Sequence, residues 1–304
     1  MKKFWKKLWK KFKQKLLGLS RLIRQTIKLY ADNEMSVYAG YTTLYIMMAM
    51  VPLLALLVGV VNMLPDVSLQ HLEAAVNNLL PDVPEVRVLL HTLITNVNRQ
   101  AGSLAISLSL VASLWSASNG VNAIQMGFCK ISGTEGSPLR QRLASMLYTV
   151  LFIALIPALL IFRVMRGSIE DLIAAANRWL NIPDIAGKLL DFMEYSGLVT
   201  VFAMVAVILL AYTYLQGDVR GEHRKLVHQL PGALFATQFW LIFSSFYEIF
   251  IKRFWQASSL YGSFASVFLA SMWLKSIVMF LFYGAALNEV LDRRRKGWKL
   301  EIEN

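Results

Sequence analysis

Residues that could carry out catalysis are few in this chain and lie far apart in the sequence. The four histidines are His71, His91, His223 and His228, and none of them belongs to an HExxH motif. There is no CxxC pair and no glycine-rich phosphate loop, and the carboxylates, Asp292 among them, are dispersed. Hydrolysis needs clustered carboxylates, a metal shell or a nucleophile beside a base. The pattern therefore predicts that the protein is not an enzyme and holds no metal ion or other cofactor.

Lys275 is the one charged residue in an apolar run from Phe264 to Leu287. A run of about 24 residues, at ~1.5 Å per residue, spans the ~30 Å hydrocarbon layer of a bilayer. A cation near the middle of a span costs several kcal/mol unless it faces water, a partner or a ligand. Lys275 either faces a hydrated or anion-accepting cavity, or it is held by backbone carbonyls or snorkels along its helix. Glu248, the nearest carboxylate that precedes Lys275 in sequence, should lie about 12 Å nearer the outer surface.

Two amides and a stripe of small residues occupy another predicted span, from Leu104 to Ile131. Small residues, including Gly120 and Gly127, recur on one face and let a neighbouring backbone approach closely. Asn119 and Asn122 lie on the adjacent face. Buried amides in a membrane need partners, so these two either tie helices together or coordinate a polar ligand.

The first predicted span, Tyr38–Leu64, contains Pro52, which removes a backbone donor and usually kinks a helix. Tyr41 and Tyr45 lie before the kink on a polar, aromatic face. They form either a band of interfacial tyrosines or the lining of a cavity, and Tyr45 should lie deeper.

The composition indicates an all-α, polytopic membrane protein, because 56% of the 304 residues are hydrophobic and only 16% are charged. Six transmembrane helices are predicted: Tyr38–Leu64, Leu104–Ile131, Leu143–Ile161, Gly197–Leu215, Leu230–Phe250 and Phe264–Leu287. The amphipathic segments 65–100 and 163–196 are too polar to span and should lie on the outer side. These features predict a transmembrane domain over residues 35–292.

The N-terminal arm, residues 1–34, is basic and amphipathic. Its apolar residues recur every three or four positions, as in a helix that lies in the headgroup layer of a membrane. Its lysines, including Lys6, Lys7, Lys10 and Lys11, should attract anionic lipids by about 1 kcal/mol each. Lys and Arg also dominate the tail, residues 293–304, so both termini are predicted to be cytoplasmic. Membrane lipids are the expected partners, nucleic acid is not expected, and a homo-oligomer is left open.

Four sequence blocks carry a resemblance to a known family: AGYTTLYIMMAMVPLLALLVGV (Ala39–Val60), WSASNGVNAIQMGF (Trp115–Phe128), LPGALFATQFW (Leu230–Trp240) and YGSFASVFLASMWL…GAALNEVL (Tyr261–Leu291). They resemble the YihY/BrkB-like family of bacterial inner-membrane proteins, long mislabelled as ribonuclease BN. The resemblance implies six transmembrane helices and a place in the bacterial cytoplasmic membrane. Positions carried over from the family pattern, as structural or pathway residues, are Pro52, Pro231, Gly232, Tyr261, Gly262, Trp273, Gly284 and Asn288. Lys275 departs from that pattern, in which an uncharged residue is expected.

Members of the family have been proposed to move lipids or other amphiphiles across the membrane. The leading hypothesis is therefore a transporter or flippase-like protein for a lipid or an amphiphilic anion. The alternative is a non-transporting scaffold or assembly factor, and a membrane-bound enzyme comes last. A ribonuclease is not expected, because no carboxylate cluster could hold a divalent metal to activate water. The candidate path residues are Lys275, Asn119, Asn122, Tyr41, Tyr45, Glu248 and Asn288. The candidate packing or kink residues are Pro52, Gly120, Gly127, Pro231, Gly232, Gly262 and Gly284.

Overall fold

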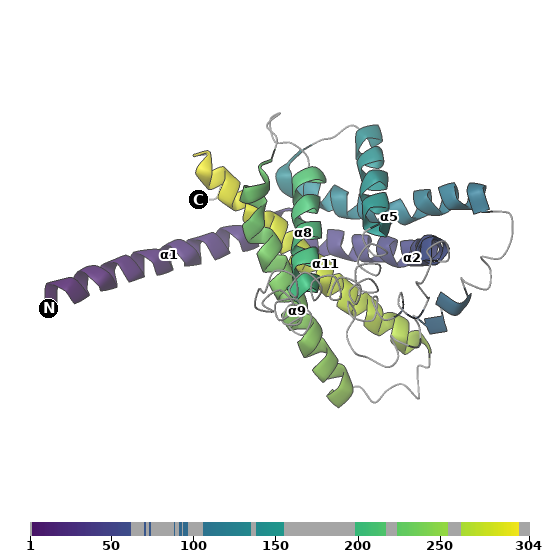
Figure 1. The fold of residues 1–304 in the computed structure, drawn as a ribbon. Helices are drawn as coiled ribbons and strands as arrows, with labels where there is room; N and C mark the ends of the chain where they lie inside the picture. The colour runs from purple at the N-terminus through teal and green to yellow at the C-terminus, as the bar shows by residue number, and fades with distance from the viewer. Residues whose placement is uncertain are drawn as a thin grey trace, which may run out of the picture.

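The computed structural model describes residues 2–61, 106–134, 138–154, 198–216, 224–254 and 263–297, with short pieces between residues 70 and 96. These residues form helices and turns, and no strand occurs among them (Figure 1). The prediction of an all-α fold is confirmed for this part of the chain. The predicted outer segment 163–196, most of segment 65–100, Gly262 and the end of the tail lie outside the described residues.

The helices are α1 (Lys2–Asp32), α2 (Met35–Val61), α5 (Ile106–Ser132), α8 (Leu198–Tyr214), α9 (Leu226–Phe254) and α11 (Ser263–Arg295). A further helical stretch, residues 138–154, follows α5. Within the described residues, three helical segments are long and apolar enough to cross a membrane: Met35–Val58, Leu226–Ile251 and Val267–Arg295.

The prediction of six spans is thus confirmed only in part. The α5 helix is long, but its serines and side-chain amides lower its mean hydropathy. The apolar segment Val201–Tyr214 of α8 is shorter than a full span. Length and composition alone therefore identify α2, α9 and α11 as the membrane-crossing candidates.

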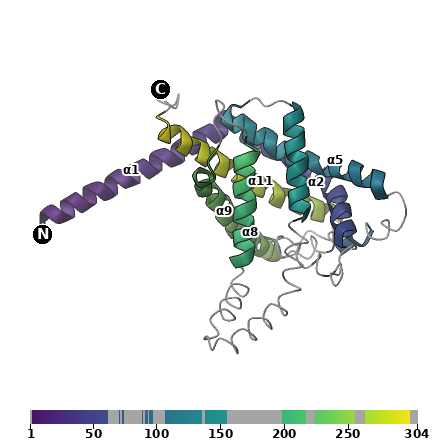
Figure 2. The same ribbon diagram turned by 45° about the horizontal axis from the view of Figure 1, so that its top comes forward.

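The α11 helix lies at the centre of the bundle and contacts α9, α2, α1 and α5. Figure 2 shows α8 and α9 on one side of it, while α2 runs along α5. Phe128 of α5 stands between Tyr212 of α8 and Phe282 of α11, with ring centroids 5.3 Å and 5.9 Å away. Edge-to-face contacts of this kind are the favourable geometry for aromatic rings, and they join three helices in one core.

Glycines stand where the helices come closest. A Cβ at Gly232 of α9 would overlap the carbonyl oxygen of Gly284 and the side chain of Asn288. A Cβ at Gly127 would overlap the ring of Phe282, and one at Gly120 would press on Ile46. These close approaches explain why small residues are needed at the crossings of α9 with α11 and of α5 with its neighbours.

The two prolines that the sequence singled out lie inside helices: Pro52 in α2 and Pro231 in α9. Pro231 was expected in the first turn of a span that begins at Leu230. The structure starts α9 at Leu226, so Pro231 lies in the second turn instead. The difference arises because residues 226–229 are also helical, and the segment that is apolar enough to cross a membrane itself begins at Leu226.

The α1 helix extends away from the bundle, with the N-terminus at its far end (Figure 1). Its C-terminal part is anchored on α11, because Tyr30 stacks on Tyr283 with the ring centroids 3.8 Å apart. Arg294 Nε also donates to Gln25 Oε1 at 2.8 Å. The backbone of the arm is helical as predicted, whereas the side chains of its first lysines lie outside the described residues.

Candidate functional site

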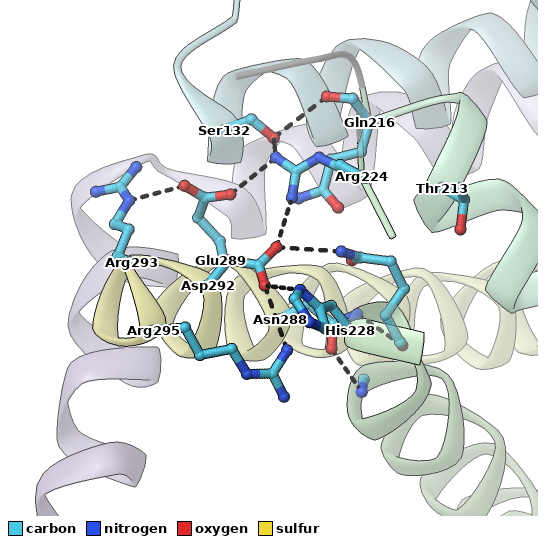
Figure 3. A network of polar contacts seen from close by, with 12 residues as sticks. Ser132, Thr213, Gln216, Arg224, His228, Asn288, Glu289, Asp292, Arg293 and Arg295 are labelled. Atoms are coloured by element: carbon cyan, nitrogen blue, oxygen red, sulfur yellow. Dashed lines mark hydrogen bonds and ion pairs between the residues drawn. The ribbon is translucent and has the colours of Figure 1, made fainter. Parts of the chain in front are cut away.

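A cluster of buried charges lies where the C-terminal part of α11 meets the start of α9 (Figure 3). The side chain of Arg224 is 4% exposed and that of Glu289 is 2% exposed. Arg224 Nη2 donates to Glu289 Oε2 at 2.8 Å, and Arg293 Nε donates to Glu289 Oε1 at the same distance. Both carboxylate oxygens of Glu289 are therefore occupied by guanidinium groups.

Asp292, one turn further along α11, belongs to the same cluster. Its carboxylate lies 3.5 Å from Arg224 Nη1, 3.4 Å from His228 Nδ1 and 3.5 Å from Arg295 Nη1. Gln229 Nε2 donates to Asp292 Oδ2 at 3.2 Å. In the sequence Asp292 is one of several dispersed carboxylates, and the fold brings it to Arg224, His228 and Gln229, which are more than sixty positions away.

The cluster also reaches the ends of α5 and α8. Arg224 Nη2 donates to Ser132 Oγ at 3.0 Å, and this hydroxyl lies 3.3 Å from the carbonyl oxygen of Gln216. Breaking a buried ion pair by removing one partner typically costs about 3–5 kcal/mol, since the remaining charge is left uncompensated. This ion-pair network therefore holds the ends of four helices in one arrangement.

Asn288 ties α11 to α9 directly beside the ion-pair network. Its Oδ1 accepts from the backbone N–H of Gly232 at 2.8 Å, and its Nδ2 donates to the carbonyl oxygen of Gln229 at 2.9 Å. The side chain is fully buried. The position is that of a helix tie, and the role in a transport path that the sequence assigned to Asn288 stays a prediction.

Asn119 and Asn122 both face the helical stretch 138–154. Arg142 Nη1 donates to Asn119 Oδ1 at 2.7 Å. Ser145 Oγ lies 3.4 Å from Asn122 Oδ1 and 2.8 Å from Gln125 Oε1. Of the two roles left open by the sequence, these contacts favour joining helices, and they leave part of each amide for a ligand.

The guanidinium of Arg142 lies over the ring of Trp115, with its central carbon 4.0 Å from the ring centroid. Its Nη2 donates to the carbonyl oxygen of Trp115 at 2.8 Å, while Nε is buried and has no hydrogen-bond partner. Trp115 itself is 54% exposed. The structure thus holds a cation against an exposed aromatic ring on the side of α5.

Lys275 is exposed on α11. No hydrogen bond or ion pair joins its ammonium group to any residue that the structure describes. The alternative in which backbone carbonyls hold this lysine therefore finds no support in the described residues. Glu248 is half-buried, and no ion pair joins it to Lys275.

Tyr41 and Tyr45 contact each other on α2, with their ring centroids 4.6 Å apart. Tyr41 is exposed and Tyr45 is half-buried. The depth of Tyr45 in the membrane, and the choice between an interfacial band and a lined path, stay predictions.

The described part of the chain contains no group of three or more His, Cys, Asp or Glu residues that could hold a metal ion. The carboxylates of the ion-pair network face arginines, His228 and Gln229 instead. The ion-pair network therefore consists of ion pairs and hydrogen bonds, which hold the helices together.

Sequence reasoning did not identify Arg224, Glu289 or Arg142 as site residues. One local signal for Glu289 was readable, since Arg293 follows it by four positions, the spacing of a helical ion pair. Arg224 carries no such signal because its partner Glu289 is 65 residues away. Arg142 lies in the helical stretch 138–154, alongside α5, and its partners Asn119 and Trp115 are more than twenty positions away.

Comparison with known proteins gives one family and one relative. The family model described as "Virulence factor BrkB" matches residues 26–302. A curated protein of Bacillus subtilis (strain 168), "Putative ribonuclease-like protein YfkH", is 27% identical over 201 residues, which cover 66% of this chain and 69% of that protein. No solved structure matches the chain.

Proposed function

This chain belongs to the virulence factor BrkB family, and we propose that it moves a lipid or another amphiphilic anion across a membrane, as a transporter or flippase-like protein. The proposal starts from the membrane-protein character of the family and of α2, α9 and α11. It then needs a place where a polar headgroup could enter an otherwise apolar bundle.

One observation carries the proposal: the burial of one face of α11 changes along its length. Phe282 is fully buried against Gly127 of α5, and Lys275 lies seven residues earlier on the same helical face but is exposed. Val267 and Phe268, another two turns away, are also exposed. The helices that cover this face at Phe282 therefore no longer cover it at Lys275, whereas α9 stays packed on another face of α11 through Leu269, Trp273 and Ile277. A lysine on that uncovered face supports a path that accepts an anionic headgroup, because an unpaired cation at this depth is costly.

The proposed arrangement has six spans over residues 35–292, with the amphipathic segments 65–100 and 163–196 outside. The arm, residues 1–34, and the tail, residues 293–304, are cytoplasmic, and the membrane is the bacterial cytoplasmic membrane. Cysteines introduced at Pro81 and Asp184 should react only with reagent added from the outside. Labelling of either position from the cytoplasmic side would contradict this topology.

Anionic lipids are the proposed partners of the arm. Residues 2–31 contain no acidic side chain, so this part of the arm presents only positive charge to a membrane surface. Leu19, Ile23 and Ile27 are exposed on one face, beside the face that packs on the bundle. An apolar edge flanked by cations is typical of a helix that lies in the headgroup layer.

A scaffold or assembly factor is the second candidate, and the ion-pair network favours it. Asn288 and Asn119 form hydrogen bonds with other helices, which is typical of a closely packed bundle that does not transport a ligand. A homo-oligomer is compatible with either function.

The experiment that tests transport uses purified full-length protein in vesicles that contain fluorescent lipids. Transport predicts that labelled lipid in the inner leaflet becomes accessible to an external quencher faster than in empty vesicles. Lys275→Leu should slow this lipid movement at least several-fold, whereas Lys130→Leu, a control at an exposed lysine near the end of α5, should leave it unchanged. If vesicles with wild-type protein move neither anionic nor zwitterionic lipid, transport is wrong and the scaffold remains.

A further inference from the structure

We propose that Arg142, stacked on Trp115, is a binding site for the phosphate group of an anionic amphiphile. This inference deepens the proposed function, on which it rests for the class of ligand, by naming the residues that would hold the headgroup. It follows from three observations: the charge balance around Arg142, the donors that it leaves unused, and the apolar surface beside it.

The charge of Arg142 is not neutralised by the described residues. Its two hydrogen bonds go to Asn119 Oδ1 and to the carbonyl oxygen of Trp115, which are neutral acceptors. No carboxylate among the residues that the structure describes forms an ion pair with it. Arg224 differs in this respect, because its guanidinium forms ion pairs with Glu289 and Asp292. Arg142 therefore keeps its full charge available for an anion.

The guanidinium also has unused hydrogen-bonding capacity. Arginine carries five N–H donors, and Arg142 uses two of them. Its Nε is buried and has no partner, so the protein alone does not satisfy the group. A phosphate offers several acceptor oxygens in the geometry that a guanidinium fork matches. Because the guanidinium of Arg142 lies against the ring of Trp115, its plane is already oriented before a ligand binds.

The surroundings of Arg142 suit a ligand with an apolar tail. Trp115, Asn119, Asn122 and Met126 recur at steps of four and three, so they share one face of α5. The two ends of this face, Trp115 and Met126, are exposed.

Next to Arg142, in the stretch 138–154, Leu139 and Leu143 are exposed as well. A headgroup on Arg142 would thus have apolar side chains on both helices to receive its chain. Burial of the alkyl chain is favourable, so an alkyl phosphate should bind more tightly than inorganic phosphate.

The test measures binding to the purified full-length protein in a neutral detergent, with dodecyl phosphate, inorganic phosphate and dodecyl sulfobetaine as separate probes. Thermal stabilisation and native mass spectrometry report binding without any need for transport. Dodecyl phosphate should bind, and Arg142→Gln should weaken its binding at least ten-fold. Arg140→Gln is the matched control, because Arg140 is an exposed arginine two positions away, and it should bind like the wild type.

Two further variants keep the proposal testable if Arg142→Gln does not fold. Arg142→Lys retains the charge but loses the planar fork, and Trp115→Leu removes the ring while it keeps the backbone acceptor. Each should weaken dodecyl phosphate binding several-fold.

Wild-type affinity in the Arg142 variants, or an equal loss in Arg140→Gln, would overturn the site. Inorganic phosphate that binds as tightly as dodecyl phosphate would overturn its assignment to an amphiphile. If Arg142-dependent binding occurs but no lipid moves in vesicles, the site stands and the proposed transport does not.

Discussion

Phe282 and Lys275 stand seven residues apart on the same face of α11, and the first is fully buried while the second is exposed. Two turns of helix separate them, about 10.5 Å along the axis. The same face therefore passes from a packed contact with Gly127 of α5 to an open surface over a short distance. A lysine in the apolar part of a span is placed where the neighbouring helices no longer cover it.

The first prediction concerns the surroundings of Lys275. In a Cys129→Ser background, Lys275→Cys should react with a charged, water-soluble thiol reagent in lipid vesicles, because a hydrated opening admits such a reagent. Val278→Cys is the control, since Val278 is buried on the same helix and should react far more slowly. Reaction of Lys275→Cys with a lipid-soluble reagent alone would mean that this position faces lipid and not a polar path.

The second prediction concerns the buried pair of Arg224 and Glu289. Arg224→Gln or Glu289→Gln alone should lower the free energy of unfolding by about 3–5 kcal/mol, because the charge left behind is buried without its partner. Thermal or denaturant unfolding in detergent measures the loss. Arg295→Gln should cost less than about 1 kcal/mol, since Arg295 is 43% exposed and its contact with Asp292 is a long one. Equal losses in all three variants would show that burial of the pair does not matter.

The third prediction concerns the closest approach of two helices. Gly232→Ala should destabilise the protein by about 1–3 kcal/mol, because the added methyl group meets the backbone of Gly284 and cannot be accommodated by a change of rotamer. Gly40→Ala is the control, since a Cβ there meets nothing within 4 Å. Unfolding temperatures in the same detergent compare the two variants. A stable Gly232→Ala variant would contradict the close contact between α9 and α11.

The fourth prediction concerns how α1 lies on a membrane. An environment-sensitive fluorophore attached at Ile23→Cys, in the Cys129→Ser background, should show a blue-shifted emission in anionic vesicles and should be quenched by quenchers attached to lipids. The same fluorophore at Arg24→Cys should remain in water, because the two side chains are exposed on different faces of the helix. In vesicles of zwitterionic lipid the difference in emission between the two positions should be smaller, since the basic residues are no longer attracted to anionic headgroups. Identical spectra at the two positions would contradict an interfacial helix.

The sequence by itself determined the helices and their membrane character. The predicted spans Tyr38–Leu64, Leu230–Phe250 and Phe264–Leu287 correspond to α2, α9 and α11, although α9 and α11 extend further. Helix formation and hydropathy are local properties, because they depend on residues three or four positions apart and on the length of an apolar run. For the same reason, the family resemblance and the basic, amphipathic arm could be predicted without a structure.

Only the tertiary structure decided which polar residues meet. Arg224 and Glu289 are 65 residues apart, and Arg142 reaches Asn119 and Trp115 across a turn between two helices. Phe282 is buried and Lys275, on the same face, is exposed; the charge of Lys275 indicated a special environment, but only the packing showed where the face becomes uncovered. Such relationships depend on where helices cross and separate, which is set by packing among all of them together and not by the sequence of any one helix.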